Sequence, residues 1–388
     1  HRRQRQMCIR DRYVLLYYYY KLLFMKSHIP KILIVGSTGE LGNKLLKFCS
    51  KNKIKVNAIT GYSNNRKLQS QKKKFNIKYD FLLNNKKNIG DFKIFLKNQN
   101  IDIIYFLDYG CESIIYADIF LKNNKNSYIA IANKEMIIAG GSLLINKITK
   151  TKNKLIPLDS EHFSLSNLKL RNESIKKIYI TASGGPFYFK KNINLNYVNK
   201  KNVLSHPKWK MGVNNSIDSS NFVNKILEMY ELSIINNIDL KKIDFLVSSE
   251  AYIHSVIINT DNIININCFD NNMLITLMKP LQIYFPKLSI PSKDIFLNNN
   301  KMKIERFRDK RFKITNYLNN LKKLSHPEQI SFMILNNIAQ KKYLTTEIDY
   351  NSIINYIMIN LKKIKLYSKF NSFDDTIKFI QFIKKNYD

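Results

Sequence analysis

The chain has 388 residues, 45% of them hydrophobic, and a formal net charge of +35. This length is enough for two or three domains with a sizeable core, which excludes a small disulfide-stabilised scaffold and a disordered chain. The charge comes mostly from Lys residues scattered among Asn and Ile, whereas nucleic-acid sites tend to combine clustered Arg with aromatic residues. We therefore expect a solvated basic surface and no nucleic-acid partner.

The four cysteines form no CxxC pair, so neither a zinc site nor a disulfide framework is indicated. Residues 1–24 differ in composition from the rest, with an Arg-rich start and an apolar stretch too short for the ~20 residues that span a bilayer. We expect this segment to be an artefact or a leader, with the protein starting at Met25 and no membrane segment. A start at Met25 favours a bacterial cytoplasm, and the plastid stroma is the alternative.

Apolar runs in the first part of the chain predict buried strands, and they alternate with helical patterns. The expected strands cover 31–35, 54–60, 101–107 and 128–132, with a helix around 92–96. Such alternation predicts an α/β fold with a Rossmann-like parallel sheet. We assign residues 25–157 to this domain, whose expected fold is typical of dinucleotide binding.

Beyond Pro157 the pattern changes to mixed α and β, with strands at 177–181 and 243–247 and a helix at 221–235. We assign residues 158–282 to a second, α+β domain, which contains Asp159, Glu161 and Glu228. Pro280, Pro286 and Pro291 then indicate a linker, which we place at residues 283–310. Apolar residues three and four apart in residues 311–388 predict a C-terminal helical bundle.

Gly36, Gly39 and Gly42 lie between the first strand and a helix, in VGSTGELG. Glycines in that position let backbone N–H groups approach a pyrophosphate at the helix N-terminus, although a tight turn alone would also use them. The second strand is followed by Ser63, Asn64, Asn65 and Arg66 instead of an acidic residue. Neutral donors and a cation suit a 2′-phosphate, so NADP(H) is favoured over NAD(H).

Asp159 and Glu161 lie two residues apart in LDSEHF, and in an extended segment both carboxylates would project to the same side. Surface acids are the ordinary alternative, but Glu228 adds a third carboxylate on a helix whose same face carries Asn224 and Lys225. Oxygen ligands of this kind suit Mg²⁺ or Mn²⁺. The sequence thus predicts a metal and a phosphate side by side.

His206 and Trp209 lie in HPKWKMG, a short basic-aromatic segment that precedes the helix with Asn224. Each could be an ordinary buried residue. A mobile lid that excludes water from a reactive intermediate is the functional interpretation.

Together the segments GSTGELG, ANKE, LDSEH, TASGGPF, HPKWKMG and NKILE, in this order, resemble the 1-deoxy-D-xylulose 5-phosphate reductoisomerase family. The resemblance extends from residue 31 to residue 286 and, more weakly, into the C-terminal helices. It implies a divergent member from an AT-rich genome. It also implies a metal-assisted rearrangement of 1-deoxy-D-xylulose 5-phosphate, followed by hydride transfer from NADPH to give 2-C-methyl-D-erythritol 4-phosphate, an isoprenoid precursor. A homodimer is implied as well.

The resemblance also assigns residues by motif. The implied metal ligands are Asp159, Glu161 and Glu228, which with Lys134 form the catalytic set. The implied substrate contacts are Lys134, Ser160, Glu161, Ser183, His206, Ser219, Asn224, Lys225 and Glu228. The implied cofactor contacts are Gly36, Thr38, Gly39, Glu40, Leu41, Gly42, Ser63, Asn64, Asn133, Glu135 and Gly212. The implied flap residues are Trp209 and Met211.

Three segments differ from the family pattern. Glu40 replaces a small residue in the glycine turn, and Tyr62 and Ser63 replace Gly and a basic residue. The segment 248–251 reads Ser-Ser-Glu-Ala where the family has His-Pro-Gln-Ser, a segment that borders the family's active site. Two alternatives therefore stay open: a degenerate relative that binds NADP(H) or a sugar phosphate without turnover, and a basic nucleic-acid-binding protein on an α/β scaffold.

Overall fold

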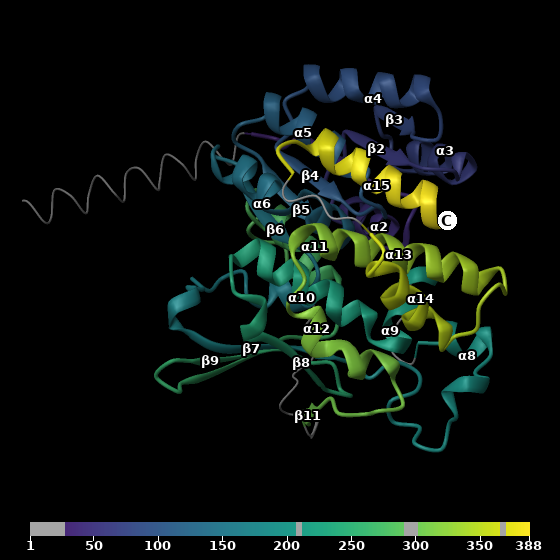
Figure 1. The fold of residues 1–388 in the computed structure, drawn as a ribbon. Coiled ribbons are helices and arrows are strands. Elements are labelled where there is room, and N and C mark those ends of the chain that lie inside the picture. Colours follow the sequence, from purple (N-terminus) through teal and green to yellow (C-terminus); the bar gives the residue numbers. More distant parts are fainter. Residues whose placement is uncertain (1–27, 207–211, 291–301, 365–369) are drawn as a thin grey trace, which may run out of the picture.

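The computed structural model describes residues 28–206, 212–290, 302–364 and 370–388 (Figure 1). Its first part is a six-stranded sheet with the order β3-β2-β1-β4-β5-β6, in which every neighbouring pair is parallel. The strands are β1 (Ile32–Val35), β2 (Ala58–Gly61), β3 (Tyr79–Leu82), β4 (Ile103–Phe106), β5 (Tyr128–Ile131) and β6 (Lys154–Pro157). The predicted Rossmann-like parallel sheet is confirmed.

Each strand of this sheet is followed by a helix. The helices are α2 (Glu40–Lys51), α3 (Asn65–Lys74), α4 (Lys86–Asn98), α5 (Ser113–Asn123) and α6 (Lys134–Thr149), and β6 leads into the short α7 (Ser160–Phe163). The central strands β1 and β4 consist entirely of buried apolar residues, which is why their sequences identify them as strands. The edge strands β3 and β6 are only partly buried and lack a continuous apolar run, so the sequence did not predict them.

The strand order places β1 between β2 and β4, so the direction of the sheet's winding reverses there. Ligands of open α/β sheets bind at such a switch point, at the carboxyl ends of the strands. Gly36 occupies this place with φ = 85°, and a Cβ atom there would lie 2.5 Å from the backbone nitrogen of Asp108 after β4. Because both the conformation and the spacing exclude a side chain, the turn after β1 requires glycine at this position.

The second sheet has five strands in the order β10-β9-β7-β8-β11. They are β7 (Ile175–Ala182), β8 (Ile243–Val247), β9 (Ile253–Asn259), β10 (Ile264–Cys268) and β11 (Glu305–Arg306). β7 runs parallel to β8 and antiparallel to β9, so the sheet is mixed, in agreement with the predicted α+β part. β11, within residues 283–310, pairs with β8 at the edge of this sheet.

Two helices follow the segment 207–211: α9 (Val213–Asn221) and α10 (Val223–Asn236). The helix predicted from Asn221 begins at Val223, because Phe222 adopts a left-handed conformation (φ = 66°) that separates the two helices. The Phe222 ring is buried, with its centroid 4.2 Å from that of Phe307. Packing of this ring accompanies the break and turns α10 toward α6.

α11 (Leu274–Gln282) contains Pro280, so the prediction that this proline marks a linker is wrong. The helix tolerates it because a short helix loses only one backbone hydrogen bond and gains a buried apolar face. That face packs against α2 and β5 of the first sheet, and the Tyr105 hydroxyl donates to the Leu277 carbonyl oxygen at 2.9 Å. The chain therefore returns to the first sheet after completing most of the second.

The C-terminal residues form the predicted helices α12 (Leu318–Leu321), α13 (His326–Leu344), α14 (Ser352–Leu361) and α15 (Phe373–Tyr387). Capping boxes formed by Ser325 with Glu328 and by Ser372 with Asp375 begin the two long helices. α15 lies against α5 and α6 of the first domain (Figure 1). A short α8 (Lys200–Leu204) and 3₁₀ turns at 172–174, 195–197, 240–242 and 313–317 complete the fold. Among the described residues, no helix is both long and apolar enough to cross a membrane.

Asp218 of α9 joins the second domain to the C-terminal helices. Its carboxylate is 3% exposed and accepts hydrogen bonds from Asn336 at 2.9 Å and Gln340 at 2.5 Å, both on α13. Burial raises the pKa of Asp218 from 3.8 to about 6, against the lowering effect of these two amides and of Lys134. The folded protein therefore holds this proton more tightly than the unfolded chain does.

We expect Asp218→Asn to flatten the pH dependence of stability. With the pKa raised on folding, the stabilising contribution is fully present below about pH 4 and is lost as the pH rises through 6, a change of about 3 kcal/mol. Urea unfolding of parent and variant at pH 4.5 and pH 7 measures it, because other carboxylates cancel in the comparison. The free energy of unfolding of Asp218→Asn should rise relative to that of the parent between pH 4.5 and pH 7. If the two proteins differ in this free energy by the same amount at both pH values, this account is wrong.

Candidate metal and substrate site

The first two carboxylates of the site follow β6. Asp159 is the N-cap residue of α7, and Glu161 lies in its first turn. The expectation that LDSEHF is extended is therefore wrong: the backbone N–H groups of Phe163 and Ser164 donate to the carbonyls of Asp159 and Ser160 at 2.8 and 3.0 Å, closing a helical turn. The carboxylates still approach each other because Asp159, outside the helix, keeps an extended backbone (ψ = 133°).

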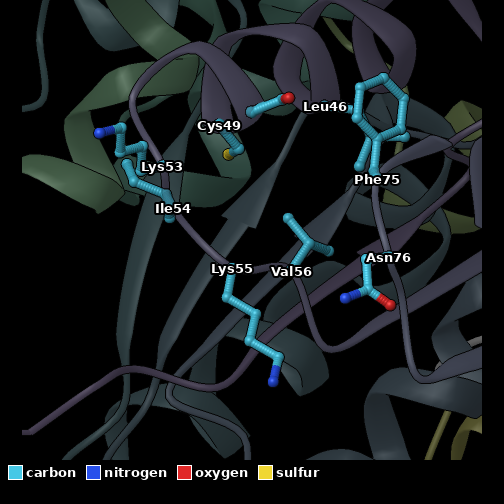
Figure 2. Close-up of a pocket in the computed structure, with 9 residues that line it drawn as sticks. Leu46, Cys49, Lys53, Ile54, Lys55, Val56, Phe75 and Asn76 are labelled. Atoms are coloured by element: carbon cyan, nitrogen blue, oxygen red, sulfur yellow. The ribbon is translucent and has the colours of Figure 1, made fainter.

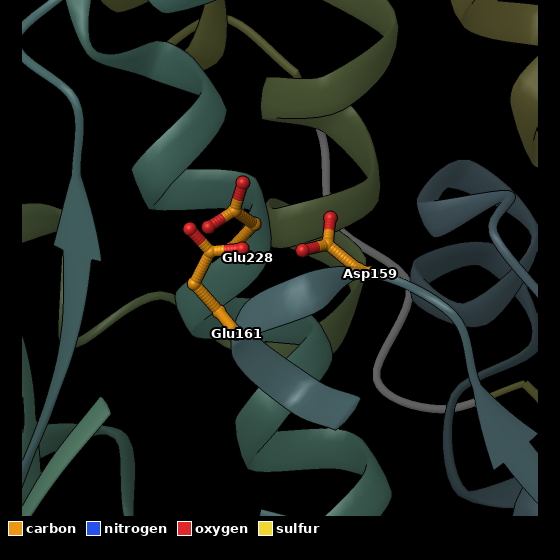
Figure 3. A group of neighbouring side chains, drawn as sticks. All are labelled: Asp159, Glu161 and Glu228. Atoms are coloured by element: carbon orange, nitrogen blue, oxygen red, sulfur yellow. The ribbon is translucent and has the colours of Figure 1, made fainter. Parts of the chain in front are cut away.

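The third carboxylate, Glu228, comes from α10. One oxygen from each of Asp159, Glu161 and Glu228 lies within 4.8 Å of the others, and Figure 3 shows the three side chains pointing toward one another from α7 and α10. Glu228 is buried, whereas Asp159 and Glu161 are partly buried. The predicted convergence of these acids is confirmed.

Two lysines lie between the carboxylates. The Lys134 ammonium is 3.2 Å from Asp159 and 3.4 Å from Glu228, and the Lys225 ammonium is 2.8 Å from Glu161 and 2.5 Å from Glu228. Lys134 begins α6 at the carboxyl end of β5, so both sheets of the molecule contribute elements around the site. When all five groups are ionised, three carboxylates and two ammonium groups leave one net negative charge.

The charges change the acidity of their neighbours. Burial would raise the pKa of Asp159, but Lys134 and His162 hold it well below its usual range. Burial raises the pKa of Glu161 to about 8, and the charges of Glu228 and Asp159 add to this against the opposing effect of Lys225. Burial would lower the pKa of the Lys134 ammonium, yet Asp159 and Glu228 raise it well above normal. Carboxylate repulsion at Glu161 is thus only partly balanced by the lysines.

These donors fit a divalent cation. Carboxylate oxygens are hard ligands of the kind that Mg²⁺ prefers, and one oxygen from each of the three acids lies within 4.8 Å of the others. A divalent ion would relieve the repulsion at Glu161 and change the net charge of the five groups from negative to positive. Asp159, Glu161 and Glu228 could therefore hold Mg²⁺ or Mn²⁺.

Polar side chains expected to bind substrate lie on the same helices. The Lys134 ammonium donates to the Asn224 side-chain oxygen at 2.6 Å, and the Ser160 hydroxyl donates to Glu161 at 2.7 Å. Asn224 also donates to Glu228 within α10, and Lys225 lies beside it, so the expected shared helix face is confirmed. The structure brings these residues directly to the carboxylate cluster.

A second polar group follows β7. The Ser183 hydroxyl and His206 Nε2 are 3.1 Å apart, and Gly184 and Gly185 continue the turn with φ of 90° and 58°. A Cβ atom on Gly185 would lie 2.6 Å from the carbonyl oxygen of Ser219 on α9. The two glycines thus let the turn of Ser183 pack closely on the helix that carries Ser219.

The residues expected to bind the cofactor surround the carboxyl ends of β1, β2 and β5. Gly39 is the N-cap of α2, and Thr38, Glu40, Leu41 and Gly42 flank it. The Asn133 side chain caps α6 and donates to the Gly110 carbonyl at 2.8 Å. Glu135 is 4% exposed, and burial raises its pKa to about 7. Asn64 caps α3 next to Ser63, and Gly212 begins α9. Trp209 and Met211 lie outside the described residues.

Sequence reasoning missed two ionisable groups near these sites. Asp108, after β4, contacts Ser113 and Asn133, and burial raises its pKa to about 6. The second group is the pair of His162 and Glu231, whose Nε2 and Oε2 atoms are 3.0 Å apart. Burial would lower the pKa of His162, but Glu231 outweighs this and raises it to about 9. Asp108 follows an apolar strand and could have been found, but the pairing of His162 with Glu231 has no sequence signal.

A cavity of about 280 Å³ lies away from these groups (Figure 2). Its walls come from the end of α2, the loop before β2 and the end of α3, including Cys49, Lys55 and Phe75. These elements meet at the amino ends of the parallel strands, whereas the carboxylates and the glycine turn lie at the carboxyl ends. The cavity therefore belongs to neither site.

Two family models match this chain. The one described as 1-deoxy-D-xylulose 5-phosphate reductoisomerase matches residues 32–118, and its C-terminal domain model matches residues 155–235. A relative from Pelagibacter ubique (strain HTCC1062) with the same description is 32% identical over 89% of this chain and 94% of its own length. The chain belongs to the 1-deoxy-D-xylulose 5-phosphate reductoisomerase family. A Wolbachia reductoisomerase is 29% identical over 90% of this chain and 94% of its own.

Solved reductoisomerase structures share the fold. One, in complex with NADPH, fosmidomycin and magnesium, has a TM-score of 0.80 over 92% of this chain and 96% of its own, at 20% identity. The reductoisomerase of Zymomonas mobilis in complex with NADPH has a TM-score of 0.77 over 92% of this chain and 98% of its own, at 22% identity. The family resemblance expected from the motifs is confirmed.

We expect Glu228→Gln to weaken Mn²⁺ binding at least about 100-fold, since losing a ligand costs more than the 10–100-fold typical of losing an outer partner. Titration of Mn²⁺ monitored by electron paramagnetic resonance of the free ion measures this directly. The matched control is Glu347→Gln. Glu347 is a half-exposed acid that pairs with Lys342 and does not belong to the carboxylate cluster. If Glu228→Gln binds Mn²⁺ as tightly as Glu347→Gln does, the three carboxylates do not form a metal site.

Proposed function

We propose that this protein is an NADPH- and divalent-metal-dependent reductoisomerase that converts 1-deoxy-D-xylulose 5-phosphate to 2-C-methyl-D-erythritol 4-phosphate in isoprenoid precursor synthesis. The observation that carries the proposal is the convergence of Asp159, Glu161 and Glu228 with two lysines at the junction of α6, α7 and α10. Related solved structures contain NADPH and magnesium, which supports the same pair of cofactors here. The residue roles below belong to this proposal.

The divalent ion supplies electrophilic polarisation of the substrate's carbonyl and hydroxyl oxygens when it is bound. Lys134 and Ser160, which contact the carboxylates, would donate hydrogen bonds to the hydroxyl end of the sugar. Because Lys134 stays protonated, it offers a positive charge where a rearranging carbonyl oxygen gains negative charge. Glu161 and Glu228 fix the position of both lysines and of the substrate.

The phosphate end of the substrate would lie on the other side of Lys225. The Lys225 ammonium and the Asn224 side chain lie on α10 next to the carboxylates. Further hydrogen-bond donors would be Ser183 and His206, near the turn after β7, and Ser219 on α9. A phosphate fixed there holds the carbon skeleton at one distance from the metal ligands. Positioning of this kind supplies a large part of a rate enhancement.

The nicotinamide cofactor would bind along the first sheet. The glycine turn after β1 presents backbone N–H groups at the N-terminus of α2, where a pyrophosphate is favoured. Asn133 and Glu135 lie in the same α6 turn as Lys134, so a cofactor that contacts them would end beside the substrate. This arrangement supports hydride transfer to an aldehyde held at Lys134.

The degenerate-relative alternative rests on residues 248–251. Ser248 continues the ladder of β8, with its N–H donating to the Ala182 carbonyl at 2.8 Å, and Ala251 adopts φ = 58°. Ser248 thus keeps the sheet hydrogen bond, whereas Ala251 adopts a left-handed conformation that non-glycine residues seldom take. The three clustered acids favour the active enzyme, because their repulsion is only partly balanced by Lys134 and Lys225 and this costs stability when no metal is bound.

We expect the purified protein starting at Met25 to oxidise NADPH when given 1-deoxy-D-xylulose 5-phosphate and Mn²⁺ or Mg²⁺. EDTA should stop the reaction, and Glu228→Gln should lower kcat at least about 1,000-fold, near the loss seen when one electrostatic group is removed from an active site. Glu347→Gln should keep the parent rate. A folded protein that binds NADPH and Mn²⁺ but does not oxidise NADPH would favour the degenerate relative.

We also place the enzyme in the cytoplasm, in line with its bacterial relatives, and propose that it is a homodimer. β10 forms an open edge of the second sheet, and Ile263, Ile264 and Ile266 are 57%, 59% and 53% exposed there. Exposed apolar residues on an unpaired strand favour association with another strand. A second copy of the same edge, related by a two-fold axis, would cover them.

We expect Ile266→Lys to raise the dimer dissociation constant at least about tenfold, since an unpaired charge costs several kcal/mol when an interface buries it. Light scattering coupled to size exclusion at several concentrations gives the mass. The matched control is Ile359→Lys, which alters an equally exposed Ile on α14 and should leave the dimer intact. Equal masses for the two variants would argue against dimerisation through β10.

A further inference from the structure

His162 and Glu231 form a buried pair behind the carboxylate cluster. Both side chains are fully inaccessible, and His162 Nε2 lies 3.0 Å from Glu231 Oε2. Among the described residues, the ring nitrogens of His162 and the carboxylate oxygens of Glu231 have no hydrogen-bond partner, so the contact between them is an ion pair without hydrogen-bond geometry. Two ionisable groups are kept together in the interior at a cost that only their mutual attraction offsets.

The pair connects the two elements that supply the metal ligands. His162 follows Glu161 in α7, and Glu231 lies three residues after Glu228, one turn along α10. The distance between α7 and α10 sets the separation of Glu161 from Glu228, because each ligand is fixed to its own helix. A contact that fixes this distance also fixes the geometry offered to the cation.

Other contacts hold α7 from a different side. Ser164 is hydrogen-bonded to Ser255 of β9 at 2.6 Å, and the ring of Phe163 stacks edge-on against Phe269 with centroids 5.6 Å apart. These contacts fasten α7 to the second sheet but not to α10. A single-turn helix has few backbone hydrogen bonds of its own, so its position depends on such side-chain contacts.

Next to His162 the interior is not completely filled. A cavity of about 200 Å³ lies against His162, between α6, β6 and the end of α10, with Ile148, Leu165 and Ile235 in its walls. Close packing would otherwise hold α7 in place from that direction. With space on that side, the pair of His162 and Glu231 is a second link between α7 and α10, beside the ion pair of Lys225 with Glu161.

We propose that Glu231 is a positioning residue for the metal site, acting through His162 to hold Glu161 at the correct distance from Glu228. This inference rests on the proposed metal site and assigns a role to a residue one shell outside it. The pair lowers the cost of bringing three carboxylates to one cation, because α7 is already held where the ion needs it. Glu231 itself does not contact the ion.

The test is Mn²⁺ affinity of the full-length protein carrying Glu231→Gln, measured by paramagnetic resonance of the free ion. We expect affinity to fall 10–100-fold, the range seen for outer partners of metal ligands. NADPH affinity, measured by fluorescence, should stay within about twofold of the parent, because the glycine turn lies on another element. Unchanged Mn²⁺ affinity in a parent that binds Mn²⁺ would overturn the proposal, whereas no binding by the parent would instead refute the metal site.

Two further variants separate positioning from general destabilisation. The double variant His162→Gln/Glu231→Gln removes both buried charges, so neither is left unpaired. If the two residues act together, its Mn²⁺ affinity should equal that of His162→Gln or Glu231→Gln alone, and the losses of the two single variants should not multiply. Asp218→Asn changes another buried carboxylate nearby and should keep the parent Mn²⁺ affinity. The proposal is overturned if the losses of Mn²⁺ affinity from His162→Gln and Glu231→Gln multiply in the double variant, or if Asp218→Asn loses as much affinity as Glu231→Gln.

Discussion

The structure depends on one constraint: three carboxylates and two ammonium groups are brought together at the meeting of α6, α7 and α10. No single element could satisfy these charges, so each helix is stabilised by side chains from the other two. α6 comes from the first sheet, and α10 packs on the second. The electrostatic balance of Lys134 and Lys225 against the acids therefore also joins the two main domains.

That junction explains why cofactor and substrate can meet. The carboxyl ends of β1, β4 and β5 face the cofactor side, and α6 carries Asn133, Lys134 and Glu135 from that edge into the carboxylate cluster. The start of α6 thus places Lys134, proposed for the substrate, between Asn133 and Glu135, proposed for the cofactor. The C-terminal helices complete the arrangement, since α13 binds the Asp218 carboxylate and α15 covers α5 and α6.

Much of this was readable from the sequence because the relevant signals are local. Buried parallel strands show continuous apolar runs, and NKILE places Asn224, Lys225 and Glu228 on one helix face by spacing alone. The turn at Asp159 and Glu161 was misread, because extended and helical backbones are both compatible with LDSEHF. Pro280 was misread because burial of α11 outweighs a weak local preference. The pair of His162 and Glu231 depends on two helices meeting in space, which spacing along the chain does not encode.

The path of α11 has a consequence for how this molecule can be divided. The first domain is discontinuous: Leu277 and Leu281, from beyond most of the second sheet, complete the core around Ile34 and Tyr105. Cutting the chain after β6 would leave a nucleotide-binding half with an apolar gap, and so would ending it before α11. The nucleotide-binding half therefore has a complete core only when the chain continues through the second sheet to α11.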